Sequence, residues 1–434
     1  MNGEREVIHK RTKHKHYLYR IKAGYYAIRV SIYKRVLLCV YLLIAALVWM
    51  FQGRLLDTSS KDVFAAIAAP IRQFTLAFYI ICGLLLLLVL FGTPWCSRRV
   101  KEGMQKIGLT NHAGETPALL ARSLDKKMPK LTVWEFDASG IPLEDWEAKR
   151  AGIETALNVT IAKIEQSEGR KVVKIYTVPA VDDFPTVLPW KAEYLSTESF
   201  VLILGESLTG TVAVNLAHIP HVLLGGSTGS GKSVLLKLLL KQAYKKGAEI
   251  YIADFKGGVD FPRSWQQWGH MILDEQTLLD NLSRIERELE NRKLQFNRYG
   301  CANIDEYNKV TGEELPRLIV ACDEVAELLD KTGRNKADKE LLGQIEGKLS
   351  LVARQGRAFG VHLILATQRP DATIIPGQIR NNIDFRVCGR ADSVLSKIIL
   401  DNTSAADLIP KSARGRFVTG DGTVFQAYYM DEET

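Results

Sequence analysis

A complete phosphate-binding motif, G-x-x-x-x-G-K-[S/T], constrains the fold of this chain more than any other feature. Its residues are Gly226, Ser227, Thr228, Gly229, Ser230, Gly231, Lys232 and Ser233. The apolar run 221–224 precedes it and the leucine-rich segment 234–240 follows, which predicts a strand, a glycine loop and a helix. Backbone N–H groups of such a loop bind phosphates, Lys232 adds a positive charge and Ser233 ligates Mg²⁺. The motif therefore predicts binding of ATP with Mg²⁺, and a glycine-rich turn without a ligand is the alternative.

The segments after residue 200 alternate between strand-like and helix-like patterns, which is typical of a parallel sheet covered by helices. The expected strands are 200–204, 221–224, 249–253, 318–322, 361–366 and 385–389. A helix is expected over 277–299, because apolar residues recur on one side and charges face the other. The pattern predicts an α/β domain over residues 200–434.

Polar side chains end several of these expected strands. Asp323 is placed to hold Mg²⁺ and Glu324 to polarise the attacking water of ATP hydrolysis. Gln368 is a candidate sensor of the γ-phosphate, with an ordinary strand-to-loop turn as the alternative. Lys256 could contact nucleotide, a neighbouring subunit or a polymer, or lie in a surface turn. Asp-Glu pairs at strand ends are common, so this pair predicts a catalytic site only because a phosphate-binding loop precedes it in an α/β pattern.

Two apolar runs predict membrane spans. Residues 36–53 and 73–97 carry no charge, and about 20 apolar residues suffice to cross a bilayer. Lys and Arg are frequent in the tail 1–35 and just after residue 97, and sparse in the connector 54–72. We therefore expect a multi-pass cell-membrane protein with both termini in the cytoplasm. The alternative for the two spans is a pair of buried helices in a soluble protein. The alternative for the basic tail is a solvated segment that does not contact the membrane.

The other bulk properties add less. The net charge of +8 fits an anionic partner without naming one. The six cysteines contain no C-x-x-C pair, which favours neither a disulfide framework nor a zinc site and fits a reducing compartment. Residues 98–199 are expected to form a small α+β adaptor domain with strands at 131–136 and 171–178, and they carry no recognisable chemistry.

Four ordered motifs carry a family resemblance. Residues 221–233, the strand that ends in Asp-Glu, residues 357–370 and Ile399-Leu400-Asp401 resemble the FtsK/SpoIIIE DNA translocases over roughly 200–430. The resemblance implies a RecA-like motor, a hexameric ring and ATP-driven movement of double-stranded DNA. The two spans, the short adaptor and the expected lack of a DNA-reading domain after the motor are more similar to TcpA-like coupling proteins of Gram-positive conjugative elements. Asp-Phe-Lys at 254–256 replaces the family's more usual Asp-Pro-Lys.

Ring motors commonly use an arginine from the adjacent subunit to neutralise charge in the transition state. The candidates are Arg354, Arg357, Arg380 and Arg386, of which Arg357 and Arg386 are favoured equally. Candidates for DNA contact are Lys256 and the run Lys331, Arg334, Lys336 and Lys339, which would grip phosphates from a pore loop. A solvated loop is the alternative for that run.

The leading hypothesis is a membrane-anchored ATPase that pumps DNA during conjugative transfer and cooperates with relaxase and channel proteins. A chromosome-partitioning pump at septa is the second hypothesis, and a protein-secretion ATPase is the third. A structural scaffold with an inactive nucleotide site is disfavoured, because Lys232, Ser233, Asp323 and Glu324 are all present.

Overall fold

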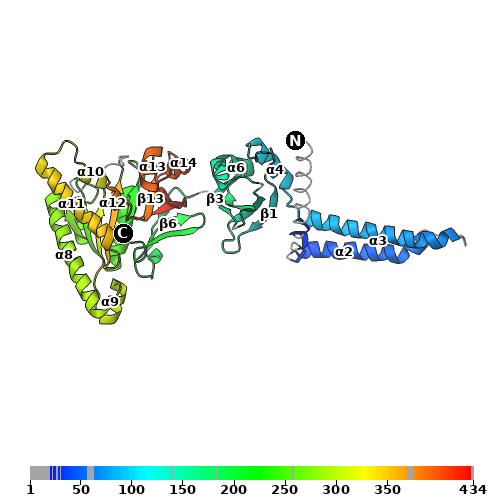
Figure 1. The fold of residues 1–434 in the computed structure, drawn as a ribbon, viewed down its shortest axis with the longest axis horizontal. Helices are drawn as coiled ribbons and strands as arrows, with labels where there is room; N and C mark the ends of the chain where they lie inside the picture. The colour runs from blue at the N-terminus through cyan, green and yellow to red at the C-terminus, as the bar shows by residue number, and fades with distance from the viewer. Residues whose placement is uncertain are drawn as a thin grey trace. The chain divides into compact units, whose positions relative to one another are not determined.

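The computed structural model describes residues 20–431 except 22, 26–27, 30, 56–62, 139, 168, 181–183, 257–258 and 369–374. Much of the predicted basic tail, residues 1–19, lies outside this part. The chain forms two compact units, residues 1–183 and 184–434 (Figure 1).

Two long helices, α2 (Ile32–Leu55) and α3 (Val63–Phe91), form a hairpin near the N-terminus (Figure 1). The Tyr41 hydroxyl donates a 2.7 Å hydrogen bond to the Ile80 carbonyl. Lys34 Nζ, near the start of α2, donates a 3.0 Å hydrogen bond to a carbonyl at the end of α3. The start of α2 and the end of α3 therefore lie next to each other.

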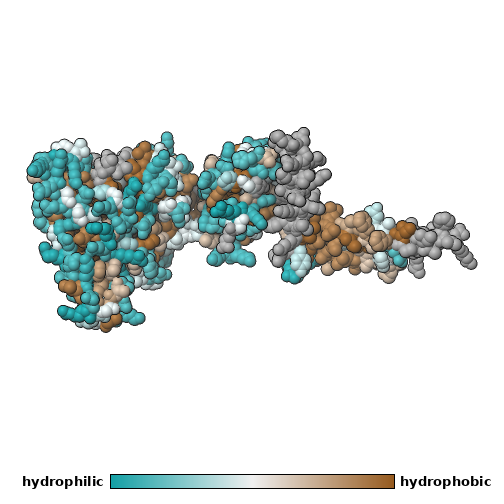
Figure 2. Space-filling model, in the orientation of Figure 1, coloured by the Kyte–Doolittle hydropathy of each residue, from teal (hydrophilic) through white to brown (hydrophobic). Residues whose placement is uncertain are grey.

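By length and composition, the segments 32–51 and 73–91 can each cross a membrane. Figure 2 shows the apolar surface along this hairpin. The predicted second run, 73–97, extends too far, because α3 ends at Phe91 and Pro94 follows. Proline lacks the N–H that a continuing helix needs.

The rest of the first unit is a four-stranded antiparallel sheet with short helices. The strand order is β1-β2-β4-β3. Its elements are α4 (Ser97–Lys106), β1 (Leu119–Leu124), β2 (Thr132–Asp137), α5 (Leu143–Ala148), α6 (Arg150–Leu157), β3 (Val159–Gln166) and β4 (Val172–Pro179). Trp146 and Phe136 are fully buried in its core, with ring centroids 5.4 Å apart. The sequence predicts β2 and β4 within one residue at each end but misses β1 and β3.

The second unit is built on one large sheet, in the order β10-β9-β11-β12-β8-β13-β14-β15-β6-β7. The pairs from β10 to β13 are parallel and the later ones antiparallel. The strands are β5 (Leu188–Pro189), β6 (Val201–Ser207), β7 (Gly210–Asn215), β8 (Val222–Gly225), β9 (Glu249–Ala253), β10 (His270–Ile272), β11 (Leu318–Cys322), β12 (Val361–Thr367), β13 (Phe385–Gly389), β14 (Arg416–Thr419) and β15 (Val424–Tyr429). All six predicted strands are present.

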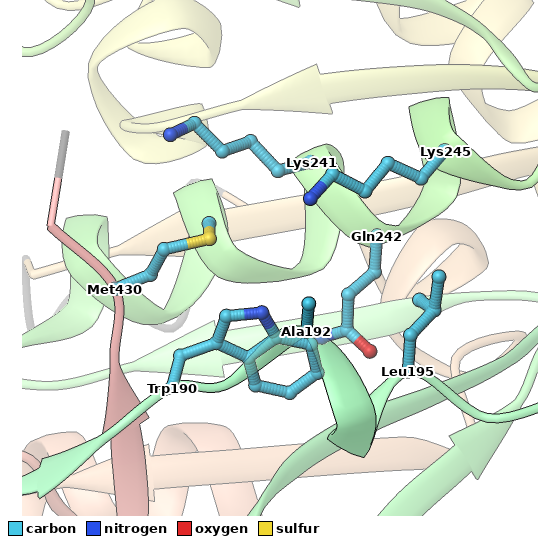
Figure 3. A pocket seen from close by; sticks show the side chains of 7 residues that line it. All are labelled: Trp190, Ala192, Leu195, Lys241, Gln242, Lys245 and Met430. Carbon is cyan, nitrogen blue, oxygen red and sulfur yellow. The ribbon is translucent and has the colours of Figure 1, made fainter. Parts of the chain in front are cut away.

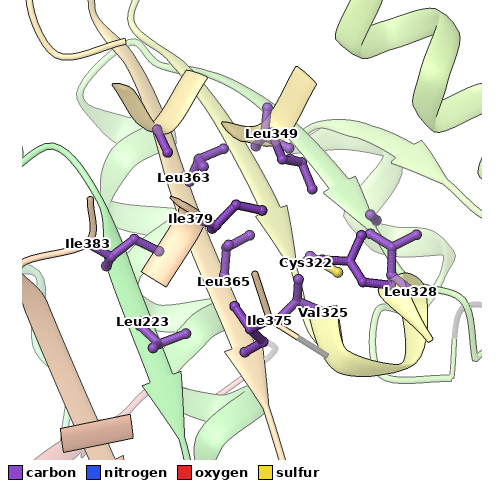
Figure 4. Close-up of a cluster of buried hydrophobic side chains, with 14 of the residues drawn as sticks. Leu223, Cys322, Val325, Leu328, Leu349, Leu363, Leu365, Ile375, Ile379 and Ile383 are labelled. Atoms are coloured by element: carbon purple, nitrogen blue, oxygen red, sulfur yellow. The ribbon is translucent and has the colours of Figure 1, made fainter. Parts of the chain in front are cut away.

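Helices cover both faces of this sheet. They are η1 (Ala192–Tyr194), α7 (Lys232–Lys245), η2 (Arg263–Gln267), α8 (Glu275–Tyr299), α9 (Ile304–Thr311), α10 (Val325–Leu329), α11 (Lys336–Gln355), α12 (Gly377–Arg380), α13 (Ser393–Leu400) and α14 (Ser404–Leu408). Leu223 of β8 packs in the core beneath α8 and α11 (Figure 4). Its neighbours Val222 and Leu224 pack in the core on the α7 side. Burial on both faces explains why the parallel strands are continuous apolar runs.

The second unit begins at residue 184, so the predicted domain boundary at residue 200 is too late. The short strand β5 pairs with β15, the last strand of the sheet. Trp190 and Tyr194 also contact Tyr428, with ring centroids 5.5 and 4.8 Å away. The sequence places this proline-containing segment in the adaptor, because nothing local reveals its pairing partner more than 200 residues away.

The strand order decides which loops meet. Strand β12 lies between β8 and β11. Parallel strands present their carboxyl ends at one edge, so the residues after β8, β11 and β12 lie next to one another there. These are the phosphate-binding loop, the Asp-Glu pair and Gln368.

Candidate nucleotide site

The phosphate-binding loop joins β8 to α7, as the motif predicts. Gly226, Gly229 and Gly231 have φ angles of 153°, 75° and 99°, which side chains other than glycine's rarely allow. A Cβ atom on Gly226 would also lie 2.5 Å from Ser230 Oγ. The first N–H groups of α7 have no acceptor within the helix. The loop is therefore a glycine-lined cradle at the positive end of a helix, which fits a phosphate.

Three predicted site residues converge at the start of α7. Lys232 Nζ donates hydrogen bonds of 2.7 Å to both the carbonyl oxygen and Oδ1 of Asp323. Ser233 Oγ donates to the same Oδ1 at 3.0 Å. A hydroxyl and a carboxylate oxygen in contact form the protein ligand set with which phosphate-loop proteins hold Mg²⁺, so the residues fit the metal.

The two carboxylates that follow β11 have different electrostatic surroundings. Burial opposes ionisation of Asp323, but Lys232 and then Lys256 outweigh it, so the pKa of Asp323 is lower than usual. Burial dominates at Glu324 and raises its pKa, although a hydrogen bond from Thr367 acts against it. Asp323 is thus held as an anion, whereas Glu324 has the raised pKa expected of a group that exchanges a proton.

The end of β12 connects Glu324 to the phosphate-binding loop. Thr367 Oγ1 donates a 2.6 Å hydrogen bond to Glu324 Oε1, and the Gln368 N–H donates to Oε2 at 3.1 Å. The side-chain oxygen of Gln368 accepts a 3.1 Å hydrogen bond from Thr228 in the loop. Gln368 therefore contacts both the loop and Glu324, which is the placement a γ-phosphate sensor needs.

Lys256 also lies in this site. Its Nζ is 3.2 Å from Asp323 Oδ2 and 2.9 Å from Asp260 Oδ2. Burial alone would lower the pKa of Lys256, but the hydrogen bond to Asp260 and the charge of Asp323 more than offset it and raise the pKa. Among the roles left open by the sequence, this position favours a contact in the nucleotide site.

The two favoured arginines have different environments. Arg386, on β13, donates from its guanidinium to Asp401 at 2.5 Å and to the Arg380 and Ile383 carbonyls at 2.9 Å. Arg357 is exposed and precedes β12, at the sheet edge opposite the phosphate-binding loop. A role for either residue in a neighbouring subunit stays a prediction.

The remaining DNA-contact candidates lie near the start of α11. Lys331 pairs with Glu346 at 2.6 Å and Arg334 with Glu275 at 3.5 Å, while Lys336 is exposed. Exposed ion pairs of this kind contribute roughly 0.2–1 kcal/mol, so a DNA phosphate could displace them. DNA contact by this run stays a prediction.

Arg390 is a site residue that sequence reasoning missed. Its guanidinium donates 2.7 Å and 3.3 Å hydrogen bonds to the Thr228 carbonyl and Ser227 Oγ, and its own carbonyl accepts from the Ser227 N–H at 2.8 Å. Arg390 follows β13, which pairs with β8. Only the strand order, which the sequence pattern did not give, could have indicated this contact.

A separate pocket opens beside the C-terminal half of α7 (Figure 3). Its lining residues are Trp190, Ala192, Leu195, Lys241, Gln242, Lys245 and Met430. None of the predicted site residues lines it. This pocket is therefore distinct from the nucleotide site.

Comparisons with known proteins agree with this geometry. A family model described as "FtsK/SpoIIIE family" matches residues 195–315. The chain is 32% identical over 229 residues to the DNA translocase FtsK of Helicobacter pylori, covering 49% of this chain and 26% of that protein. It is also 32% identical over 223 residues to the DNA translocase SftA of Bacillus subtilis, covering 48% and 22% respectively. The chain thus spans about a quarter of these relatives' length.

A solved structure is similar over a larger share of the chain. The pCW3 conjugation coupling protein TcpA, in its monomer form with ATPγS, is 37% identical with a TM-score of 0.59. The match covers 78% of this chain and 96% of that one. With the strand order and the phosphate-binding loop, it confirms the predicted α/β motor fold. The chain belongs to the FtsK/SpoIIIE family.

Proposed function

We propose that this chain is a membrane-anchored, ATP-driven DNA translocase that acts as a coupling protein in conjugative DNA transfer. The observation that carries the proposal is the 37% identity to TcpA, a conjugation coupling protein, over 78% of this chain. That share exceeds the second unit alone, which has 251 of the 434 residues. The similarity therefore extends beyond the motor into the first unit.

The site residues have complementary roles in this proposal. Lys232 and the loop N–H groups bind the phosphates of ATP, and Ser233 and Asp323 hold Mg²⁺. The metal supplies positive charge that offsets the charge developing on the phosphates. Glu324 polarises the attacking water, and Gln368 reports the state of the γ-phosphate to the loop and to Glu324. The contact of Glu324 with Gln368 supports this assignment.

Movement of DNA requires more than one copy of the motor. We propose a hexameric ring in which Arg357 or Arg386 completes the neighbouring nucleotide site. DNA passes through the ring and is gripped at its phosphates by Lys331, Arg334 and Lys336, without sequence preference. Relaxase and channel proteins of a conjugation apparatus are the proposed partners.

The hairpin of α2 and α3 anchors this motor in the cell membrane. Lys34, near the start of α2, contacts the end of α3, which supports placing the start of α2 and the end of α3 on the same side of the membrane. The enrichment of Lys and Arg next to these ends favours the cytoplasmic side. The nucleotide site then faces the compartment that holds ATP.

A chromosome-partitioning pump is the second candidate. The 32% identity to the translocases FtsK and SftA over about half of the chain favours it. The two candidates share the same motor chemistry and differ in their cellular context. Genes for a relaxase and a channel ATPase beside this gene support conjugation, whereas a location among division or sporulation genes supports partitioning.

The test uses the full chain in lipid nanodiscs. ATP turnover is measured with and without linear double-stranded DNA, for the wild type, Lys232→Ala and the control Lys309→Ala, which changes an exposed lysine of α9. DNA should stimulate turnover in the wild type and the control, and Lys232→Ala should abolish it. Donor cells that carry Lys232→Ala should transfer no plasmid. Turnover indifferent to DNA, or normal transfer by Lys232→Ala, would contradict the proposal.

A further inference from the structure

A buried aspartate, Asp254, binds the backbone N–H of Lys256. Strands β9 and β11 pair in parallel with Ala253 opposite Cys322, so the residues that follow the two strands meet. Asp254, 1% exposed, accepts hydrogen bonds from the N–H groups of Lys256 at 3.0 Å and Phe261 at 3.3 Å. This turn directs Lys256 toward the residue that follows Cys322.

The carboxylate of Asp323 lies between two ammonium groups. Lys232 Nζ contacts Oδ1 at 2.7 Å, and Lys256 Nζ contacts Oδ2 at 3.2 Å. The Asp323 side chain is 2% exposed and that of Lys256 is 30% exposed. A carboxylate this buried is unfavourable without a partner. Lys256 covers it from the solvent side and is itself held by Asp260.

The contact of Lys232 with Asp323 competes with its role in the phosphate-binding loop. Both hydrogen bonds of Lys232 at this point go to Asp323, whereas a bound triphosphate attracts the same ammonium group. The Asp323 carboxylate must then stay next to Ser233, as it is here, to hold Mg²⁺. Another cation in contact with the carboxylate can maintain that arrangement, and Lys256 is already there.

We propose that Lys256 is a positioning residue of the nucleotide site, which holds the Asp323 carboxylate in place beside Ser233 when Lys232 engages the phosphates. The inference rests on the proposed ATPase function and replaces the predicted contact of Lys256 with DNA. Lys256 differs from Lys331 in the burial of the carboxylate with which it pairs. Lys331 pairs with Glu346, which is 30% exposed, whereas Lys256 pairs with a carboxylate that is almost completely buried.

The test measures nucleotide binding without DNA. Full chain in nanodiscs is titrated with a fluorescent ATPγS analogue at several Mg²⁺ concentrations, for wild type, Lys256→Met, Lys256→Arg and the control Lys309→Met, at an exposed lysine of α9. Lys256→Met should weaken Mg²⁺-dependent binding about tenfold and raise the Mg²⁺ concentration needed for half-saturation. Lys256→Arg, which keeps the charge, should bind the nucleotide nearly as well as the wild type. Lys309→Met should bind it with the affinity of the wild type. Thermal unfolding verifies that each variant is folded.

A second measurement separates this role from DNA contact. The logarithm of DNA affinity is plotted against that of salt concentration for wild type and Lys256→Met. A nucleotide-site role leaves the slope unchanged, whereas loss of a phosphate contact reduces it by about one. Normal nucleotide binding by folded Lys256→Met, or a reduced slope, overturns the proposal. Wild-type protein that binds ATPγS but ignores DNA would instead count against the translocase function and leave this inference standing.

Discussion

Thr367 Oγ1, at the end of β12, donates a 2.6 Å hydrogen bond to Oε1 of Glu324, which lies just after the neighbouring strand β11. Both side chains are buried. The bond fixes one oxygen of the carboxylate that we assign to water activation. The residue next to Thr367 is Gln368, which contacts the phosphate-binding loop, so a shift at the loop can reach Glu324 through one peptide unit.

We expect Thr367→Val to lower kcat about tenfold at neutral pH, the size of one hydrogen bond to a charged group. The Thr367 hydrogen bond lowers the pKa of Glu324, against the effect of burial. Its removal raises that pKa further, so the acid limb of the pH–rate profile should move to higher pH. Thr367→Ser keeps the hydroxyl and should retain the wild-type profile. An unchanged acid limb in Thr367→Val would remove Glu324 from the role of water activator.

Arg390 should matter for nucleotide affinity more than for chemistry. Its guanidinium donates hydrogen bonds to Thr228 and Ser227 of the loop and to the Lys411 carbonyl, rather than to Asp323 or Glu324. Arg390→Met should leave the loop less ordered and weaken ATPγS binding about tenfold, with kcat at saturating ATP little changed. Equilibrium binding and steady-state kinetics check the two quantities. A large loss of kcat with normal binding would show that Arg390 acts in the chemical step.

Two buried histidines should make the motor sensitive to acid. Burial lowers the pKa of His221 to about 4, and burial with Arg317 lowers that of His362 to about 3. Each ring donates one hydrogen bond to a carbonyl, of Ala353 and Pro220, and is neutral. Unfolded histidine binds a proton below about pH 6.5. The stabilisation is therefore complete above that pH and is lost as the pH falls toward 4 and then 3.

At pH 5 the two histidines together should cost on the order of 4 kcal/mol of unfolding free energy relative to pH 8. Denaturant unfolding of the full chain in detergent at both pH values measures the difference. The double variant His221→Gln with His362→Gln should lose most of this pH dependence, since Gln can both donate and accept. His270→Gln, at an exposed site, is the matched control. Equal pH dependence in wild type and double variant would refute the assignment.

The sequence predicts the core strands of the motor well because of their burial. Strands β9, β11 and β13 match the predicted 249–253, 318–322 and 385–389 at both ends. Each is an apolar run between polar turns. Strands β14 and β15 were missed, because they pair antiparallel beyond the parallel core and contain polar residues such as Thr419 and Gln426. Their identity as strands depends on partners, which a local pattern does not reveal.

In the nucleotide site too, the sequence predicts residue types from local patterns but does not reveal contacts between residues that are distant in the sequence. The motif and the strand ends give the residue types of Lys232, Asp323 and Glu324, since each follows directly from local sequence. Lys232 and Asp323 are 91 positions apart in the sequence. They meet because β8 and β11 both flank β12, so the residues that follow these two strands lie near one another. The sequence leaves Lys256 open between a contact with nucleotide, a neighbouring subunit or a polymer such as DNA, and a surface turn, because a lysine after a strand carries no local sign of its partner. Its contact with Asp323 depends on the parallel register of β9 and β11.

The environments of Arg357 and Arg386 predict that substitution of Arg386 lowers stability, whereas substitution of Arg357 lowers kcat. Arg386 has three acceptors within its own chain, so Arg386→Ala should lower the unfolding free energy by about 1.5–3 kcal/mol. Arg357 is exposed and has no side-chain hydrogen bond to a described residue. Arg357→Ala should therefore leave stability unchanged and, if this residue completes the neighbouring site, lower kcat about a thousandfold.

Mixed rings test whether Arg357 acts on a neighbour. Lys232→Ala lacks a working nucleotide site but keeps Arg357, and Arg357→Ala has the reverse defect. In an equal mixture, about one interface in four pairs an intact site with an intact arginine, so DNA-stimulated turnover should recover to that fraction of the wild type. Arg357→Lys by itself should stay nearly inactive, because lysine cannot reproduce the planar guanidinium, and its mixture with Lys232→Ala should recover to the same fraction, because the Lys232→Ala subunits supply the arginine. A mixture no more active than its separate components would assign the acting arginine elsewhere.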